Sequence, residues 1–80
     1  MKELIKFSAA WCGPCKMQKK IMDGLDLGVT VKEVDIDEDF EFASQFNIRG
    51  VPTLVLLEDG VEVKRQSGVM QAKQLEEFVK

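Results

Sequence analysis

The chain has 80 residues, which is the size of one small domain, and 45% of them are hydrophobic, as in a globular protein. Its net charge of -3 and the lack of a dense basic run argue against binding to nucleic acid. No apolar run approaches the length that crosses a bilayer. We therefore expect one monomeric domain over residues 1–80, with no membrane or nucleic-acid partner.

Hydrophobic patterning in chain order predicts four strands and three helices. Strands are expected over 4–8, 29–36, 53–57 and 61–65, and helices from residue 14, over 40–46 and from about residue 71. Pro14 suits the first helical position, where its missing N–H is harmless. The first helix is expected to bury an apolar face of Met17, Ile21, Met22 and Leu25.

Turn and cap residues separate these elements. Asp37 and Asp39 are N-cap candidates for the second helix, which Asn47 or Gly50 can close. Asp59-Gly60 is a hairpin signal between the last two strands. The resulting order, βαβαββα, predicts an α/β domain with two parallel strands around a crossover helix, followed by a hairpin and a closing helix.

The motif Trp11-Cys12-Gly13-Pro14-Cys15 lies between the first strand and the first helix. It holds both cysteines of the chain, and a Cys-X-X-Cys pair at such a junction indicates dithiol redox chemistry. Cys12 is at the helix start, where unpaired N–H groups and the positive dipole end favour a thiolate. Cys15 is close enough to attack a mixed disulfide formed by Cys12.

Other interpretations of the two cysteines are weaker. A structural disulfide would close a very short loop and stabilise the fold little. A zinc half-site or a shared iron–sulfur cluster lacks ligands, because the chain has no His and no second Cys pair. We therefore favour a redox-active pair that needs neither cofactor nor metal.

The chain resembles the thioredoxin family. The resemblance extends from about Leu4 to the end of the chain, and Leu4 corresponds to the second strand of a full-length member. The matching motifs are the active-site segment 11–16, the strand end Val34-Asp35-Ile36-Asp37, the proline loop Ile48-Arg49-Gly50-Val51-Pro52-Thr53, the hairpin Asp59-Gly60 and the glycine of Ser67-Gly68. The resemblance implies a minimal thioredoxin fold, which glutaredoxins also have: a four-stranded mixed sheet flanked by three helices.

The resemblance also implies roles for individual residues. The Val51–Pro52 bond would be cis, so that the Val51 backbone can pair with an extended substrate segment. An apolar substrate-binding patch around Cys12 would consist of Trp11, Pro14, Ile48, Val51, Pro52, Gly68 and Val69. Alternatives remain open: Pro52 as a trans strand start, Trp11 as a core aromatic, and Gly68 as a simple strand end.

Two charged residues depart from the family pattern. Lys6 stands where the family has a buried aspartate, and Glu33 stands where that aspartate has its lysine partner. Strand alternation places Lys6 on one face with Leu4, and Glu33 on one face with Val31. We hypothesise a sign-exchanged ion pair under the active site, with Glu33 accepting the proton of Cys15. The alternative is two surface charges.

These features predict a protein-disulfide reductase. Gly13-Pro14 favours a reducing role, because Pro14 withholds an N–H that would stabilise the thiolate. The resemblance implies a thioredoxin reductase-like electron donor and targets such as ribonucleotide reductase. Residues 1–7 lack the apolar core of a signal peptide, so we expect a cytoplasmic protein. The alternatives are a glutaredoxin-like reductant recharged by glutathione and a non-catalytic binding subunit.

Overall fold

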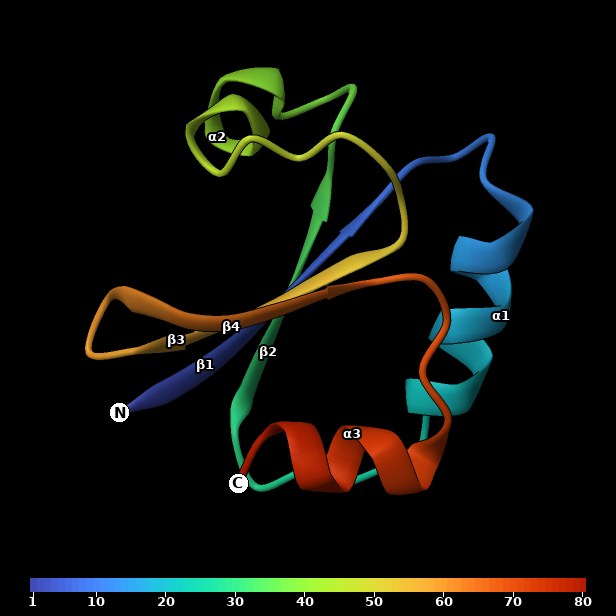
Figure 1. Ribbon diagram of the computed structural model, residues 1–80. Helices are drawn as coiled ribbons and strands as arrows, with labels where there is room; N and C mark the ends of the chain where they lie inside the picture. The colour runs from blue at the N-terminus through green and yellow to red at the C-terminus, as the bar shows by residue number, and fades with distance from the viewer.

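A mixed four-stranded sheet forms the centre of the molecule, and the computed structural model describes all of residues 1–80 (Figure 1). The elements are β1 Lys2–Ser8, α1 Gly13–Met22, β2 Thr30–Asp35, α2 Phe40–Gln45, β3 Thr53–Glu58, β4 Val61–Ser67 and α3 Ala72–Phe78. The predicted order βαβαββα is therefore confirmed. In the sheet order β2-β1-β3-β4, β1 is parallel to β2 and antiparallel to β3, and β4 is antiparallel to β3.

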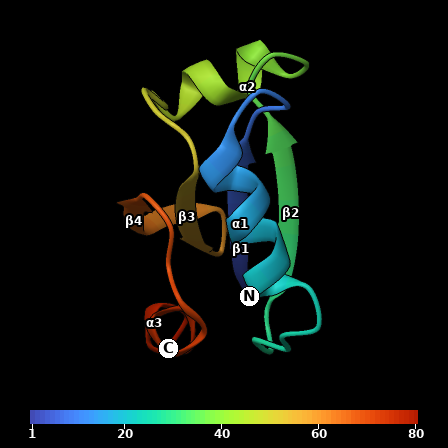
Figure 2. The same ribbon diagram turned by 90° about the vertical axis from the view of Figure 1, so that its right-hand side faces the viewer.

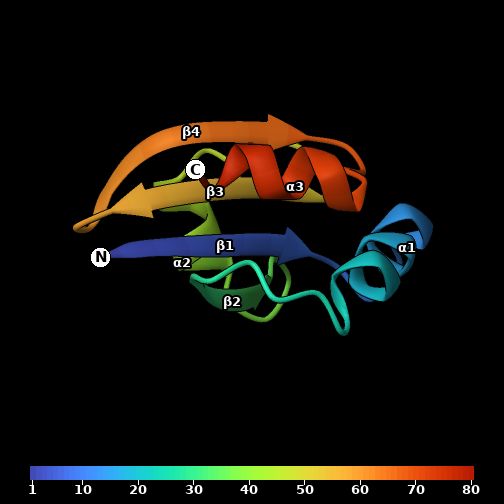
Figure 3. The same cartoon turned by 90° about the horizontal axis from the view of Figure 1, so that it is seen from below.

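The three helices cover the two faces of this sheet unequally. Figures 1 and 3 show α2 on one face and α3 on the other, and Figure 2 shows α1 in front of β1. Because β1 and β3 are the central strands, their side chains alternate between two buried layers. One layer, on the α1 and α3 side, contains Leu4, Leu54, Leu56, Met70, Leu75 and Val79.

The second layer lies on the α2 side of the sheet. It contains Ile5, Phe7, Val34, Ala43, Val55 and Leu57. Phe7 is fully buried there, and its ring centroid lies 6.1 Å from that of Phe42 and 5.5 Å from that of Phe46. Aromatic pairs at such distances add to the stabilisation that comes from burial alone. This cluster holds α2 against the sheet.

Element boundaries differ slightly from the predicted ones. β1 begins at Lys2 and β4 continues to Ser67, because pairing with β3 extends to Lys2↔Glu58 and Thr53↔Ser67. α1 starts one residue before Pro14, and α3 follows its N-cap Gln71 as expected.

Some predicted details of the helices are wrong. Met17 is exposed rather than part of the buried face of α1, while Gln18 is fully buried. The face that meets the sheet starts from Cys15 and continues through Gln18, three residues on, so Met17 points away from it. Asp37 does not cap α2; Asp39 is its N-cap residue but makes no side-chain cap bond. Asn47 does close α2, with the positive φ of 54° that is typical after a helix end.

None of the helices combines the length and apolar character needed to cross a bilayer.

Candidate active site at the start of helix α1

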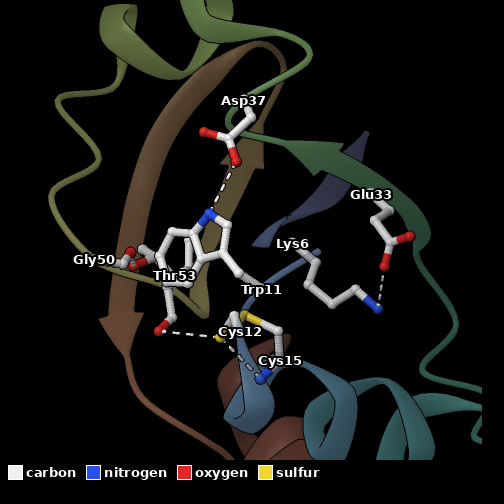
Figure 4. The surroundings of a disulfide bond; sticks show 9 residues. Lys6, Trp11, Cys12, Cys15, Glu33, Asp37, Gly50 and Thr53 are labelled. Carbon is white, nitrogen blue, oxygen red and sulfur yellow. Dashed lines mark hydrogen bonds and ion pairs between the residues drawn. A yellow bond between two sulfur atoms is a disulfide. The ribbon is translucent and has the colours of Figure 1, made fainter. Parts of the chain in front are cut away.

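Cys12 and Cys15 form a disulfide at the junction of β1 and α1 (Figure 4). Their Cα atoms lie 5.3 Å apart, and each residue is about 95% buried, with exposed fractions of 4% and 5%. Cys12 is the N-cap residue of α1, and the backbone N–H of Cys15 donates to Cys12 Sγ at 3.1 Å. The helix start therefore directs an N–H group at the sulfur that would carry negative charge.

The sequence around the pair explains this geometry. Pro14 in the first turn has no N–H, so the donor that reaches Cys12 Sγ is the N–H of Cys15. Before the helix, the N–H of Cys12 donates to the carbonyl of Ala9 at 3.1 Å and closes a turn after β1. Ala9 and both cysteines then pack together as a small buried cluster.

The proline loop lies directly beside the disulfide. The Val51–Pro52 peptide bond is cis, as predicted, and Cys12 Sγ lies 3.7 Å from the carbonyl oxygen of Val51. The N–H of Gly68 donates to the carbonyl of Pro52 at 2.9 Å, and Gly68 has a φ of +90° that favours glycine. The structure thus brings the proline loop and the segment after β4 together at the redox pair.

The remaining residues of the predicted patch differ in burial. Pro14 is exposed, Val69 is half-buried, and Ile48 is half-buried against the α2-side core. Val51 contacts both that core and the cysteine cluster. Val51 therefore connects the proline loop to the disulfide.

Trp11 is exposed, so its interpretation as a core aromatic is wrong. Its indole N–H donates to Asp37 Oδ2 at 2.9 Å (Figure 4). From the sequence, Asp37 is a cap candidate and part of a strand-end motif, and this contact is not predicted. The signal was present in the topology, because β1 and β2 are parallel and the register Ser8↔Asp35 brings the segments after both strands to the same edge.

Lys6 and Glu33 form the predicted ion pair, with Lys6 Nζ 2.7 Å from Glu33 Oε2. They are register partners on β1 and β2. The Lys6 side chain is 7% exposed, whereas that of Glu33 is 51% exposed. The alternative of two surface charges is therefore wrong for Lys6. Figure 4 shows the lysine chain extending from β1 to the carboxylate of Glu33.

A cavity of about 360 Å³ opens on the Cys15 side of the disulfide. Cys15 and Glu33 both line it, together with Lys16, Lys19, Asp35 and Glu38. The cavity is mainly polar at its wall and large enough for several water molecules. It places the buried sulfur and the half-exposed carboxylate at one solvent-accessible space.

Gln18 is the other residue that sequence reasoning missed. Its side-chain amide accepts from the N–H of Met70 at 2.7 Å and donates to the carbonyl of Met70 at 3.1 Å. A polar residue in an amphipathic helix is ordinarily assigned to the solvent face, and no local signal marks this one as buried.

No group of three or more His, Cys, Asp or Glu side chains is arranged to ligate a metal ion. The site consists of the Cys12–Cys15 disulfide, two adjoining loops and an ion pair beside a polar cavity.

Comparison with known proteins gives consistent results. The thioredoxin family model matches residues 1–80. The thioredoxin of Chlamydia trachomatis is 44% identical over 69 residues, covering 82% of this chain and 68% of that protein. The thioredoxin of Bacillus subtilis is 38% identical over 80 residues, covering 95% and 77%. A mutant thioredoxin from Halobacterium salinarum superposes with a TM-score of 0.91 at 36% identity, covering 98% of this chain and 71% of that one.

Proposed function

Because this chain belongs to the thioredoxin family of thiol-disulfide oxidoreductases, we propose that it acts as a reductant in which Cys12 attacks and Cys15 resolves. Membership of the family implies disulfide-containing proteins as substrates and a reductase as the electron donor. The observation that supports these roles is the N–H of Cys15, which donates to Cys12 Sγ at the helix start.

The exchange proceeds in two steps. The Cys12 thiolate attacks one sulfur of the substrate disulfide; the substrate S–S bond breaks, and the departing substrate thiolate takes up a proton. The Cys15 thiolate then attacks Cys12 Sγ, which breaks the mixed disulfide and releases the second substrate thiolate. The substrate gains two electrons, and the protein is left with the Cys12–Cys15 disulfide seen here.

The residues between the cysteines support the reducing direction. Pro14 removes one of the N–H groups that a helix start would otherwise offer to the Cys12 thiolate. A less stabilised thiolate makes the reduced form less stable and the couple more reducing. We expect a reduction potential nearer to the thioredoxin reference of about -270 mV than to about -120 mV, the value of a strong oxidant.

Glu33 is proposed to accept the proton that Cys15 loses before the second step. Glu33 and Cys15 line one cavity, so water in it can connect the two groups. Lys6 holds the carboxylate at 2.7 Å and is itself buried, which restricts where Glu33 can lie. In this arrangement Glu33 is a proton acceptor, and Lys6 positions it.

The test of this role is the pH profile of the second step in Glu33→Gln. Single-turnover resolution of a preformed mixed disulfide on Cys12 should slow about 100-fold or more at neutral pH, as expected for loss of a general base. Glu38→Gln is the matched control, because it removes a carboxylate from the same cavity without touching Lys6. If Glu33→Gln resolved the mixed disulfide at the same rate as the unsubstituted protein at every pH, the role of Glu33 would be excluded.

We further propose a monomer in the cytoplasm, recharged by a flavin-dependent thioredoxin reductase and able to reduce targets such as ribonucleotide reductase. The presence of both cysteines in one chain supports a site that is complete in the monomer. A dithiol that must remain reduced requires a reducing compartment, which supports the cytoplasm.

Insulin-disulfide reduction, measured with each electron source separately, tests the proposed function. Activity with NADPH and thioredoxin reductase is expected, and it should disappear in Cys12→Ser. Activity with glutathione and glutathione reductase alone would instead indicate a glutaredoxin-like reductant. No activity with either source, combined with partner binding that survives Cys12→Ser, would indicate a binding subunit.

A further inference from the structure

Two hydrogen bonds of the Gln18 side-chain amide join helix α1 to the segment after β4. Gln18 lies one turn after Cys15 and is fully buried. Its side chain both accepts from and donates to the backbone of Met70, at 2.7 and 3.1 Å. Met70 itself is 2% exposed, so water cannot easily replace either bond.

The segment after β4 is anchored by backbone hydrogen bonds on both sides of Val69. The N–H of Gly68 donates to the carbonyl of Pro52, and the N–H of Met70 donates to the side chain of Gln18. Between these anchored positions, neither the N–H nor the C=O of Val69 has a hydrogen-bond partner within the chain. Free backbone groups beside fixed neighbours are what an extended peptide needs for β-type pairing.

From this arrangement we propose that Gln18 is a positioning residue for protein substrates, acting through Met70 on the free backbone of Val69. The inference rests on the proposed function. α1 carries both sulfurs, and Gln18 on the same helix holds the loop. The sulfurs and the backbone that would bind substrate are thereby kept at one relative position, which is the main requirement for orienting a substrate disulfide toward Cys12.

The residue type is specific to this task. A glutamine amide offers one acceptor and one donor, which match the N–H and C=O of a single backbone residue. Methionine has a similar length but neither group, so Gln18→Met would leave two backbone groups of Met70 without partners in a buried place. Leucine likewise lacks both groups, and it fills a volume similar to that of glutamine.

The test compares protein and small-molecule disulfides in Gln18→Met. We expect KM for insulin reduction to rise about five- to tenfold, with kcat little changed. This rise in KM is the factor that corresponds to the loss of positioning hydrogen bonds. Reduction of the small disulfide 5,5′-dithiobis(2-nitrobenzoate), which needs no backbone pairing, should stay within about twofold of the unsubstituted protein.

Gln74→Met is the matched control. It removes an amide that also accepts a backbone N–H, from Gln71 at the start of α3, and that makes no hydrogen bond to α1. Gln74→Met should reduce insulin and the small disulfide with the same kinetic constants as the unsubstituted protein. Gln18→Leu is the second variant, used with the same comparison if Gln18→Met does not fold, and it should give a similar rise in KM for insulin.

An unchanged KM for insulin in the folded variant, or equal losses for both disulfides, would overturn the inference. If the unsubstituted protein itself failed to reduce insulin with thioredoxin reductase, the proposed function would fail instead. The two failures are therefore distinguishable.

Discussion

The ion pair between Lys6 and Glu33 is unequally exposed, so its two halves should respond differently to substitution. The Lys6 side chain is 7% exposed and that of Glu33 is 51% exposed. Glu33→Gln leaves a buried ammonium without its counter-charge, which is destabilising. Lys6→Met instead leaves a half-exposed carboxylate that water can solvate, and it keeps most of the buried apolar stem.

The magnitude follows from the separation of 2.7 Å between Lys6 Nζ and Glu33 Oε2. The Coulomb energy at that distance is about 1.5 kcal/mol in a water-like dielectric and about 6 kcal/mol at an effective dielectric of 20. Because the carboxylate is half-exposed, the lower part of this range applies, and the amide of the new glutamine still accepts a hydrogen bond. We expect Glu33→Gln to lower the free energy of unfolding by about 2 kcal/mol.

Urea unfolding of the oxidised protein at neutral pH measures this difference. A loss of about 2 kcal/mol corresponds to a fall in Tm of roughly 10 °C for a domain of this size. The free energy of unfolding of Lys6→Met should stay within about 1 kcal/mol of that of the unsubstituted protein. The double variant Lys6→Met/Glu33→Gln should be about as stable as Lys6→Met, because no ammonium is left without a partner. A larger loss in Lys6→Met than in Glu33→Gln would refute the argument from burial.

Three further predictions concern the core, the hairpin and the indole contact. Phe7→Ala should lower the free energy of unfolding by about 3–5 kcal/mol in urea titrations, since Phe7 is fully buried; a loss below about 1 kcal/mol would contradict its central place. Hydrogen bonding from Arg65 lowers the pKa of Glu62 below its usual 4.5, so this pair stabilises the fold above that pH and loses its effect as the pH falls. Arg65→Met should therefore reduce stability by up to about 1 kcal/mol at pH 7, and the difference from the unsubstituted protein should narrow toward pH 3 in unfolding experiments; a gap that does not depend on pH would count against it. Asp37→Ala should lower the fluorescence anisotropy of Trp11 while costing less than about 1 kcal/mol, because the bond is exposed; unchanged anisotropy would mean that it does not restrain the indole.

The order of elements and the redox pair could be predicted because both depend on neighbours in the sequence. Alternating apolar residues define strands, and Asp59-Gly60 sets the hairpin between β3 and β4. The cysteine motif lies at the junction of β1 and α1, where the start of a helix supplies the N–H to Cys12 Sγ. The cis bond before Pro52 was predicted by the motif, not by any general preference of proline.

The pair of Lys6 and Glu33 could be predicted only in part. Their pairing followed from strand alternation and from the family comparison, but their unequal burial did not, because it depends on which strand lies at the edge of the sheet. β2 is an edge strand and β1 is central, so one partner is covered and the other meets solvent. Only the assembled sheet contains that information.

The amino-acid sequence by itself determined the βαβαββα order, the two cysteines at a helix start and the proline loop, since each rests on short-range rules. Only the tertiary structure decided that Gln18 is buried rather than Met17, and that Trp11 lies exposed against Asp37. The partners of Gln18 and Trp11 are 52 and 26 residues away. Whether a polar group can be buried depends on a partner that the chain brings to it only on folding.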